Sequence, residues 1–162
     1  MSALLLLVII VAIAGLLAIP GAQFLPGFAR LLEDPRIERG TFSVLSGRSA
    51  LQGRFQGRDV AVRLQLKRSR HGQGDLVVAM RTVADGSLNT AGIESRVRDG
   101  DGQRALSTLA AHDLILSADE RWLQARWRPQ GFVFFPGRFA EERWRPVLES
   151  LRTVAASLDA AT

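Results

Sequence analysis

An unbroken apolar segment at the N-terminus constrains this chain more than any other feature. From Ser2 to Ile19 the sequence carries no charged residue, and Pro20 follows directly. A helix of this length spans about 27 Å, close to the thickness of the hydrocarbon core of a bilayer. Each leucine, isoleucine or valine favours insertion by about 0.3–0.6 kcal/mol, and proline ends the helix. Residues 1–20 are therefore predicted to form a transmembrane anchor.

A cleaved signal peptide is the alternative interpretation of this segment. Such a peptide needs a basic region before its apolar core and a small-x-small cleavage site after it. No lysine or arginine precedes the apolar run, and the one cleavage pattern, Ala12-Ile13-Ala14, lies inside it. The sequence thus favours a retained anchor.

The basic residues beside the segment indicate its orientation. None precedes the segment, whereas Arg30, Arg36 and Arg39 follow it. Because basic residues stay on the cytoplasmic side, we expect the N-terminus outside and the C-terminal domain in the cytoplasm. Lys67 is the only lysine among 21 basic residues, which suggests a GC-rich bacterial genome. The predicted location is the bacterial inner (cytoplasmic) membrane, with a single pass.

Small residues within the anchor suggest a place where another helix approaches. Ala14, Gly15 and Ala18 share one helical face, which would allow close contact with a neighbouring membrane helix. Alanine is also simply common in such helices, and that simpler explanation stays open.

Residues 21–40 are predicted to be a juxtamembrane connector interrupted by prolines. Phe28, Leu31 and Leu32 would lie on one side of a short amphipathic turn. This turn either rests on the membrane surface or caps the domain that follows.

Residues 41–162 are predicted to form one α+β domain, a mostly antiparallel sheet covered by a C-terminal helix. Apolar and polar residues alternate in short runs, as in half-buried strands. Strands are expected at 42–44, 51–55, 60–67, 75–83, 93–97, 114–117, 122–127 and 132–135, with a hairpin turn at 56–59. Helical spacing predicts a short helix at 103–111 and a long C-terminal helix with Pro146 in its first turn.

Composition excludes several function classes. The chain has 162 residues, no cysteine and two histidines, so disulfide scaffolds, thiolate catalysis and cysteine metal sites are ruled out. The net charge of +5 is mild, and no nucleic-acid-binding motif accompanies it. We expect no cofactor, no metal and no nucleic-acid partner. An enzyme with a dispersed site is a remaining alternative, although few groups titrate near neutral pH.

Arginine and tryptophan gather in the C-terminal half. The tetrapeptide Arg-Trp-Arg-Pro occurs twice, and all three tryptophans lie among arginines. Both residue types are enriched at protein interfaces and in cation–π pairs. A candidate surface for a partner or a lipid headgroup therefore comprises Arg121, Trp122, Arg126, Trp127, Arg128, Arg143, Trp144 and Arg145. In the alternative interpretation, Trp127 and Trp144 are core residues with arginines over their rings.

A basic loop is a second candidate site. Arg68, Arg70 and His71 precede two glycines and could hold a phosphate or a carboxylate. A solvated hairpin loop is the alternative.

These features predict a single-pass, non-enzymatic accessory or scaffolding subunit of a larger bacterial membrane complex. Its expected partners are the lipid bilayer and other membrane-protein subunits. The alternative function is a membrane-tethered module that binds an anionic small molecule or a lipid headgroup.

Overall fold

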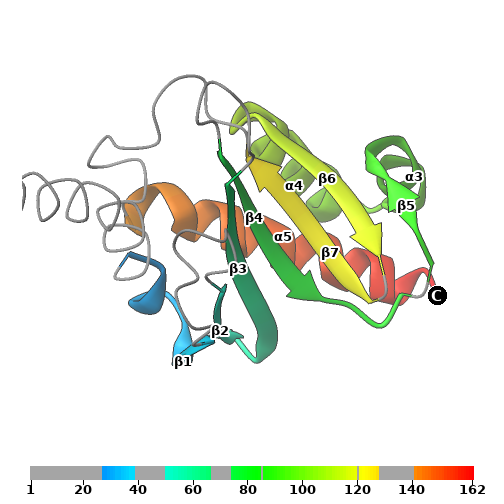
Figure 1. The fold of residues 1–162 in the computed structure, drawn as a ribbon. Coiled ribbons are helices and arrows are strands. Elements are labelled where there is room, and N and C mark those ends of the chain that lie inside the picture. Colours follow the sequence, from blue (N-terminus) through cyan, green and yellow to red (C-terminus); the bar gives the residue numbers. More distant parts are fainter. Residues whose placement is uncertain (1–26, 39–49, 67–73, 85, 120, 128–140) are drawn as a thin grey trace, which may run out of the picture.

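A seven-stranded antiparallel sheet forms the body of the molecule, in the order β1-β2-β3-β4-β7-β6-β5 (Figure 1). The computed structural model describes residues 27–38, 50–66, 74–84, 86–119, 121–127 and 141–162. Its elements in chain order are β1 (Glu33–Glu38), β2 (Ala50–Phe55), β3 (Arg58–Leu66), β4 (Gly74–Arg81), β5 (Leu88–Asn89), α3 (Thr90–Arg96), α4 (Gly100–Ala111), β6 (Leu114–Asp119), β7 (Trp122–Trp127) and α5 (Glu141–Ala160). The predicted α+β class, mostly antiparallel sheet and C-terminal helix are confirmed.

One face of the sheet is apolar and carries the core. A row of directly opposed residues crosses five strands, and each of its members is at most 4% exposed: Leu51, Val62, Val78, Ala125 and Leu116. Because side chains alternate between the two faces of a strand, residues one position along the chain from this row point to the opposite face. The strand register therefore defines both the core and the surface behind it.

Helices α4 and α5 lie side by side behind the sheet (Figure 1). Asp99 caps the start of α4, where its carboxylate accepts a hydrogen bond of 2.6 Å from the Gly102 amide. The hydrogen bond from Ser157 of α5, followed by that from the Gly102 amide, lowers the pKa of Asp99. A Cβ on Gly102 would lie 2.3 Å from Val97 Cγ1 and 2.7 Å from Ser157 Oγ, so only glycine fits where the helices meet.

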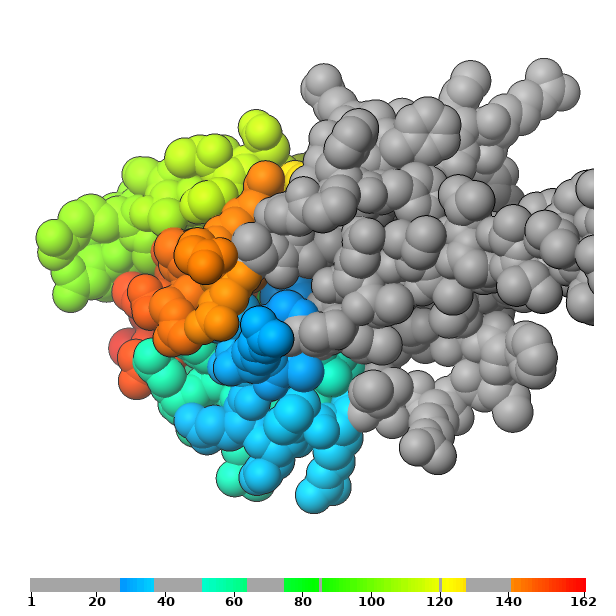
Figure 2. Space-filling view, turned by 90° about the vertical axis from the view of Figure 1, so that its left-hand side faces the viewer, coloured from blue at the N-terminus to red at the C-terminus, as the bar shows by residue number. Residues whose placement is uncertain are grey.

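The first described residues belong to the core. Phe28, Leu31 and Leu32 are at most 7% exposed, and the Phe28 ring lies 5.1 Å from the Trp144 ring, centroid to centroid. The first described residues, drawn in blue, accordingly lie against the start of α5, drawn in orange (Figure 2). Of the two interpretations of this turn, the structure shows the one in which it packs on the domain.

A polar clamp joins the C-terminal helix to the sheet. Arg58 Nη2 lies 2.7 Å from Asp159 Oδ2, and the Val83 amide donates to Asp159 Oδ1 at 2.7 Å. Thr82 Oγ1 donates to the same carboxylate oxygen. Partial burial raises the pKa of Asp159, but the hydrogen bonds from Thr82, Arg58 and Val83 and the Arg58 charge outweigh it and leave this pKa lowered.

Two of the predicted elements are wrong in detail. Residues 93–97 are not a strand, because Asn89 caps a helix there by accepting a hydrogen bond from the Gly92 amide. Ile93 and Val97 satisfy strand alternation and helical i, i+4 spacing equally well, and both are buried. Pro146 lies inside α5 and not in its first turn, since the helix already begins at Glu141.

The hairpin turn predicted at 56–59 is confirmed. Phe55 pairs with Arg58, so Gln56 and Gly57 form a two-residue connection, and both have positive φ. The strands predicted at 42–44 and 132–135 lie outside the described residues. The same holds for the predicted anchor at 1–20. Among the helices that the structure does describe, none is both long and apolar enough to cross a bilayer.

Candidate functional site

The face of the sheet opposite α4 and α5 carries the candidate site. Its central row runs from Arg36 on β1 through Gln52, Ala61, Ala79 and Gln124 to Ser117 on β6, with each residue opposite the next. Two alanines at the middle of this row leave the centre of the face low. Arginines and a tryptophan in the neighbouring rows rise on both sides of it.

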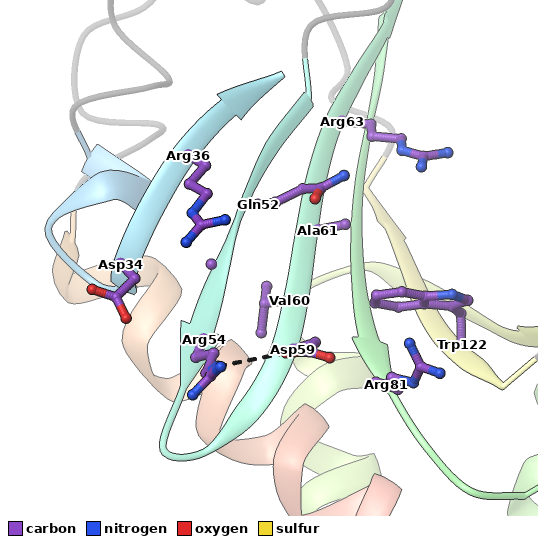
Figure 3. A pocket seen from close by; sticks show the side chains of 11 residues that line it. Asp34, Arg36, Gln52, Arg54, Asp59, Val60, Ala61, Arg63, Arg81 and Trp122 are labelled. Carbon is purple, nitrogen blue, oxygen red and sulfur yellow. Dashed lines mark ion pairs between the residues drawn. The ribbon is translucent and has the colours of Figure 1, made fainter.

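Two connected hollows follow the central row, and we call them together the open-face groove. One has a volume of about 360 Å³ and is lined by residues of β1, β2 and β3 together with Arg81 and Trp122. The other, of about 230 Å³, is lined by residues of β3, β4 and β7 together with Asp119 of β6. Ala61, Arg63 and Trp122 line both. Figure 3 shows the first hollow, with Arg36 and Arg54 on one side and Trp122 and Arg81 on the other.

Positive charge predominates in the first hollow. Arg36, Arg54, Arg63 and Arg81 line it, together with the carboxylates of Asp34 and Asp59. Arg54 Nε lies 3.8 Å from Asp59 Oδ1, a loose contact between two exposed side chains. Within the described part of the chain, neither Arg36 nor Arg63 has a carboxylate at ion-pair distance. These two guanidiniums can therefore accept a carboxylate from a ligand without first breaking an ion pair of the described protein.

Trp122 forms the apolar wall of the groove. Its side chain is partly exposed on the open face, and Arg81 Cζ lies 5.9 Å from the centre of its ring (Figure 3). Trp122 on β7 is directly opposite Arg81 on β4, and this strand pairing brings the guanidinium to the ring in a cation–π contact. Tryptophan and arginine are both enriched among the residues that contribute most at the centres of protein-binding interfaces.

The other two tryptophans lie in the core, on the opposite side of the sheet. Trp127 is 5% exposed and Trp144 is 1% exposed, and their ring centres are 5.7 Å apart in an edge-to-face arrangement. Arg143 Cζ lies 4.8 Å from the centre of the Trp127 ring. The tryptophans of the two Arg-Trp-Arg-Pro copies therefore pack together in the core, with Arg143 over the Trp127 ring. This agrees with the alternative interpretation, in which both are core residues with arginines over their rings.

The remaining members of the Arg–Trp set are dispersed. Arg126 is on the open face, opposite Val77, and Arg121 is exposed at the turn between β6 and β7. Arg145 is on α5, where it pairs with Glu141 one helical turn away. Of the members of this set that the structure describes, Trp122 and Arg126 are the two on the groove side of the sheet.

Several candidate residues lie outside the described residues. They are Arg128 of the Arg–Trp set, Arg68, Arg70 and His71 of the basic loop, and Ala14, Gly15 and Ala18 of the anchor. Their roles remain predictions from sequence.

The groove also contains Arg36, Arg54, Arg63 and Arg81, none of which was predicted to be a site residue. They come from four different strands, so no linear motif unites them. The available signal was the alternation in β3, where Ala61 and Arg63 point away from buried Val60 and Val62.

The groove offers guanidinium groups, carboxylates and one indole ring, which can recognise a ligand by charge and shape. Within the described residues, no cluster of three or more acidic or histidine side chains is suited to a metal ion, and the residues lining the groove include no histidine. Comparisons with protein-family models, curated proteins and solved structures find no match to this chain.

Proposed function

We propose that this chain is a non-enzymatic accessory or scaffolding subunit of a larger bacterial membrane complex, and that it holds a partner subunit on the open face of its sheet. The observation that carries the proposal is the division of the sheet into two faces. One face is buried beneath α4 and α5, whereas the other presents guanidinium groups and a partly exposed tryptophan around a groove. A face of this composition is suited to protein recognition.

The membrane anchor belongs to the same proposal and rests on the sequence. The apolar segment at residues 1–20 would tether the domain to the inner membrane, with the domain in the cytoplasm. Tethering raises the effective concentration of the domain near other membrane subunits, so a shallow groove is sufficient to hold a partner.

A membrane-tethered module that binds an anionic small molecule or a lipid headgroup is the second candidate. The pair of guanidiniums at the β1 end of the groove, Arg36 and Arg54, favours it, because both point into the larger hollow (Figure 3). Two arginines on one hollow can form the forked hydrogen bonds that phosphate and carboxylate prefer.

Native purification tests the proposed function. An affinity tag at Thr162 would be used to extract the chain from its own membranes in mild detergent, and mass spectrometry would identify what accompanies it. We expect stoichiometric recovery of membrane-protein subunits, and loss of those subunits when Arg36→Glu and Arg63→Glu are combined. Arg152→Glu, an exposed change on α5, is the matched control and should leave recovery unchanged.

Two results would contradict the proposal. Recovery of a monodisperse monomer without other subunits would favour the small-anion module. Subunits that remain bound to the double variant but are lost with Arg152→Glu would place the partner on the helical side.

A further inference from the structure

We infer that the open-face groove binds an extended, predominantly acidic segment of a partner protein, an inference that rests on the proposed role as an accessory subunit. The proposal names the chemistry of the occupant: a peptide in extended conformation that places carboxylates beside Arg36 and Arg63 and an apolar side chain against Trp122.

The shape of the groove favours a linear occupant. The central row crosses from β1 to β7 through three intervening strands. At about 4.8 Å between strands the groove extends roughly 19 Å, which equals about six residues of extended peptide. The four arginines come from four separate strands and stand on different sides of the larger hollow (Figure 3), so they can contact carboxylates at several points along an extended occupant.

The distribution of charge favours a peptide over a polyanion. Arginine predominates, yet Asp34, Asp59 and Asp119 also line the two hollows. Carboxylates at these positions repel a nucleic-acid backbone or an anionic membrane surface, both of which present regularly spaced negative charge. A peptide can instead place acidic residues beside the arginines and neutral or basic residues beside the aspartates.

Recognition in the groove depends on side chains. Strands β2, β3, β4 and β7 each pair with a neighbour on both edges, so their backbone groups are already used within the sheet. A peptide crossing this face therefore gains its affinity from the guanidiniums and from burial of Trp122, not from strand addition at an edge.

Trp122 provides a direct reporter of binding. It is the only one of the three tryptophans that is not buried, since Trp127 and Trp144 are in the core. The difference in fluorescence between the unaltered chain and Trp122→Phe is therefore the emission of Trp122 alone, which reports on the groove. The probe is a ten-residue peptide rich in glutamate and aspartate with one central leucine, added to the full chain in detergent micelles. Peptides with glutamine and asparagine, or with lysine, in the acidic positions are the controls.

We expect saturable binding of the acidic peptide, and at least tenfold weaker binding of both control peptides. Arg63→Glu should raise the dissociation constant of the acidic peptide at least tenfold. Ala79→Leu should raise it by the same factor, because the larger side chain fills the centre of the groove. Arg152→Glu should leave the dissociation constant within twofold. Inorganic phosphate and mixed micelles that contain anionic lipid are added separately, and neither should displace the peptide.

The outcomes separate this inference from the proposed function. Three results would overturn the acidic-segment inference: no saturable response to the acidic peptide, equal binding of the peptide with glutamine and asparagine, or displacement by phosphate or by anionic lipid. If subunits still co-purify in that case, the accessory role stands and another surface holds the partner. If the peptide binds as expected but no subunit co-purifies, the groove chemistry stands and the accessory role fails.

Discussion

The guanidinium of Arg58 lies 2.7 Å from the carboxylate of Asp159, which ties the first residue of β3 to the last turn of the C-terminal helix. The same guanidinium donates to the Arg81 carbonyl at 3.0 Å, at the end of β4. One cation thus links the central sheet to α5 at the edge of the groove, where Arg81 stands beside Trp122.

Asp159→Asn is expected to destabilise the domain. It removes the negative charge of the carboxylate that accepts hydrogen bonds from Thr82 and the Val83 amide and pairs with Arg58. The expected cost is about 1.5–3 kcal/mol, the range for hydrogen bonds to a charged group. Urea unfolding followed by circular dichroism measures the change, with Glu149→Gln on the exposed side of α5 as control. Equal unfolding midpoints for the two variants would show that the clamp contributes nothing.

The same carboxylate predicts a pH dependence. The pKa of Asp159 in the folded chain is below its ordinary value of 3.8. A lowered pKa means that the stabilisation is complete above this ordinary value and is lost as the pH falls through the folded pKa. The free energy of unfolding, measured at decreasing pH, should therefore fall less below pH 3.8 in Asp159→Asn than in the unaltered chain.

Gly102→Ala is expected to disrupt the contact between α4 and α5. The added methyl group would lie 2.3 Å from Val97 Cγ1, so overpacking should cost about 1–3 kcal/mol. Gly100→Ala is the matched control, because a Cβ there meets nothing within 4 Å and alanine favours a helix by up to about 1 kcal/mol. Thermal unfolding should show a lower Tm for Gly102→Ala and a higher Tm for Gly100→Ala. Shifts in the same direction would contradict the predicted clash at Gly102.

The tryptophans on the two sides of the sheet should respond differently to truncation. Trp127→Ala removes a buried ring from the aromatic cluster and should cost about 3–5 kcal/mol. Trp122→Ala removes a partly exposed ring and should cost well under half as much, while abolishing peptide binding in the groove. Denaturant midpoints measured side by side test this contrast.

The anchor at residues 1–20 can be tested by placing a charge within it. Ile10→Arg should shift the chain from the membrane pellet to the soluble fraction, because arginine at the centre of a membrane helix costs about 2.5–3.5 kcal/mol. Ile10→Leu is the control and should remain in the pellet. Sedimentation after alkaline extraction distinguishes them, and a soluble unaltered chain would exclude the anchor.

The sequence was sufficient to predict the class of fold, because alternation in residues 60–66 and helical spacing near the C-terminus are strong signals. It was insufficient for residues 93–97, where Ile93 and Val97 fit two periods at once. There the decisive contact is the short-range cap by Asn89. The packing of Phe28 on Trp144 depends on two distant parts of the chain and left two interpretations open.

The groove was harder to predict than the fold. Its floor depends on Ala61 and Ala79 being opposite each other, which follows only from the register of β3 and β4. Its walls combine arginines from four strands with Trp122, whose role differs from that of Trp127 only five positions later. Composition indicated the right residue types, but strand pairing decides which of them share a surface.

The pairing of β4 with β7 determines when the open-face groove is complete. It joins the part of the chain before α3 to the part after α4, and the groove takes Arg63 from the first part and Trp122 from the second. A half-assembled chain therefore offers a partner only half of the binding surface. Under the proposed function, a partner that needs both Arg63 and Trp122 would bind only chains in which β4 and β7 have already paired.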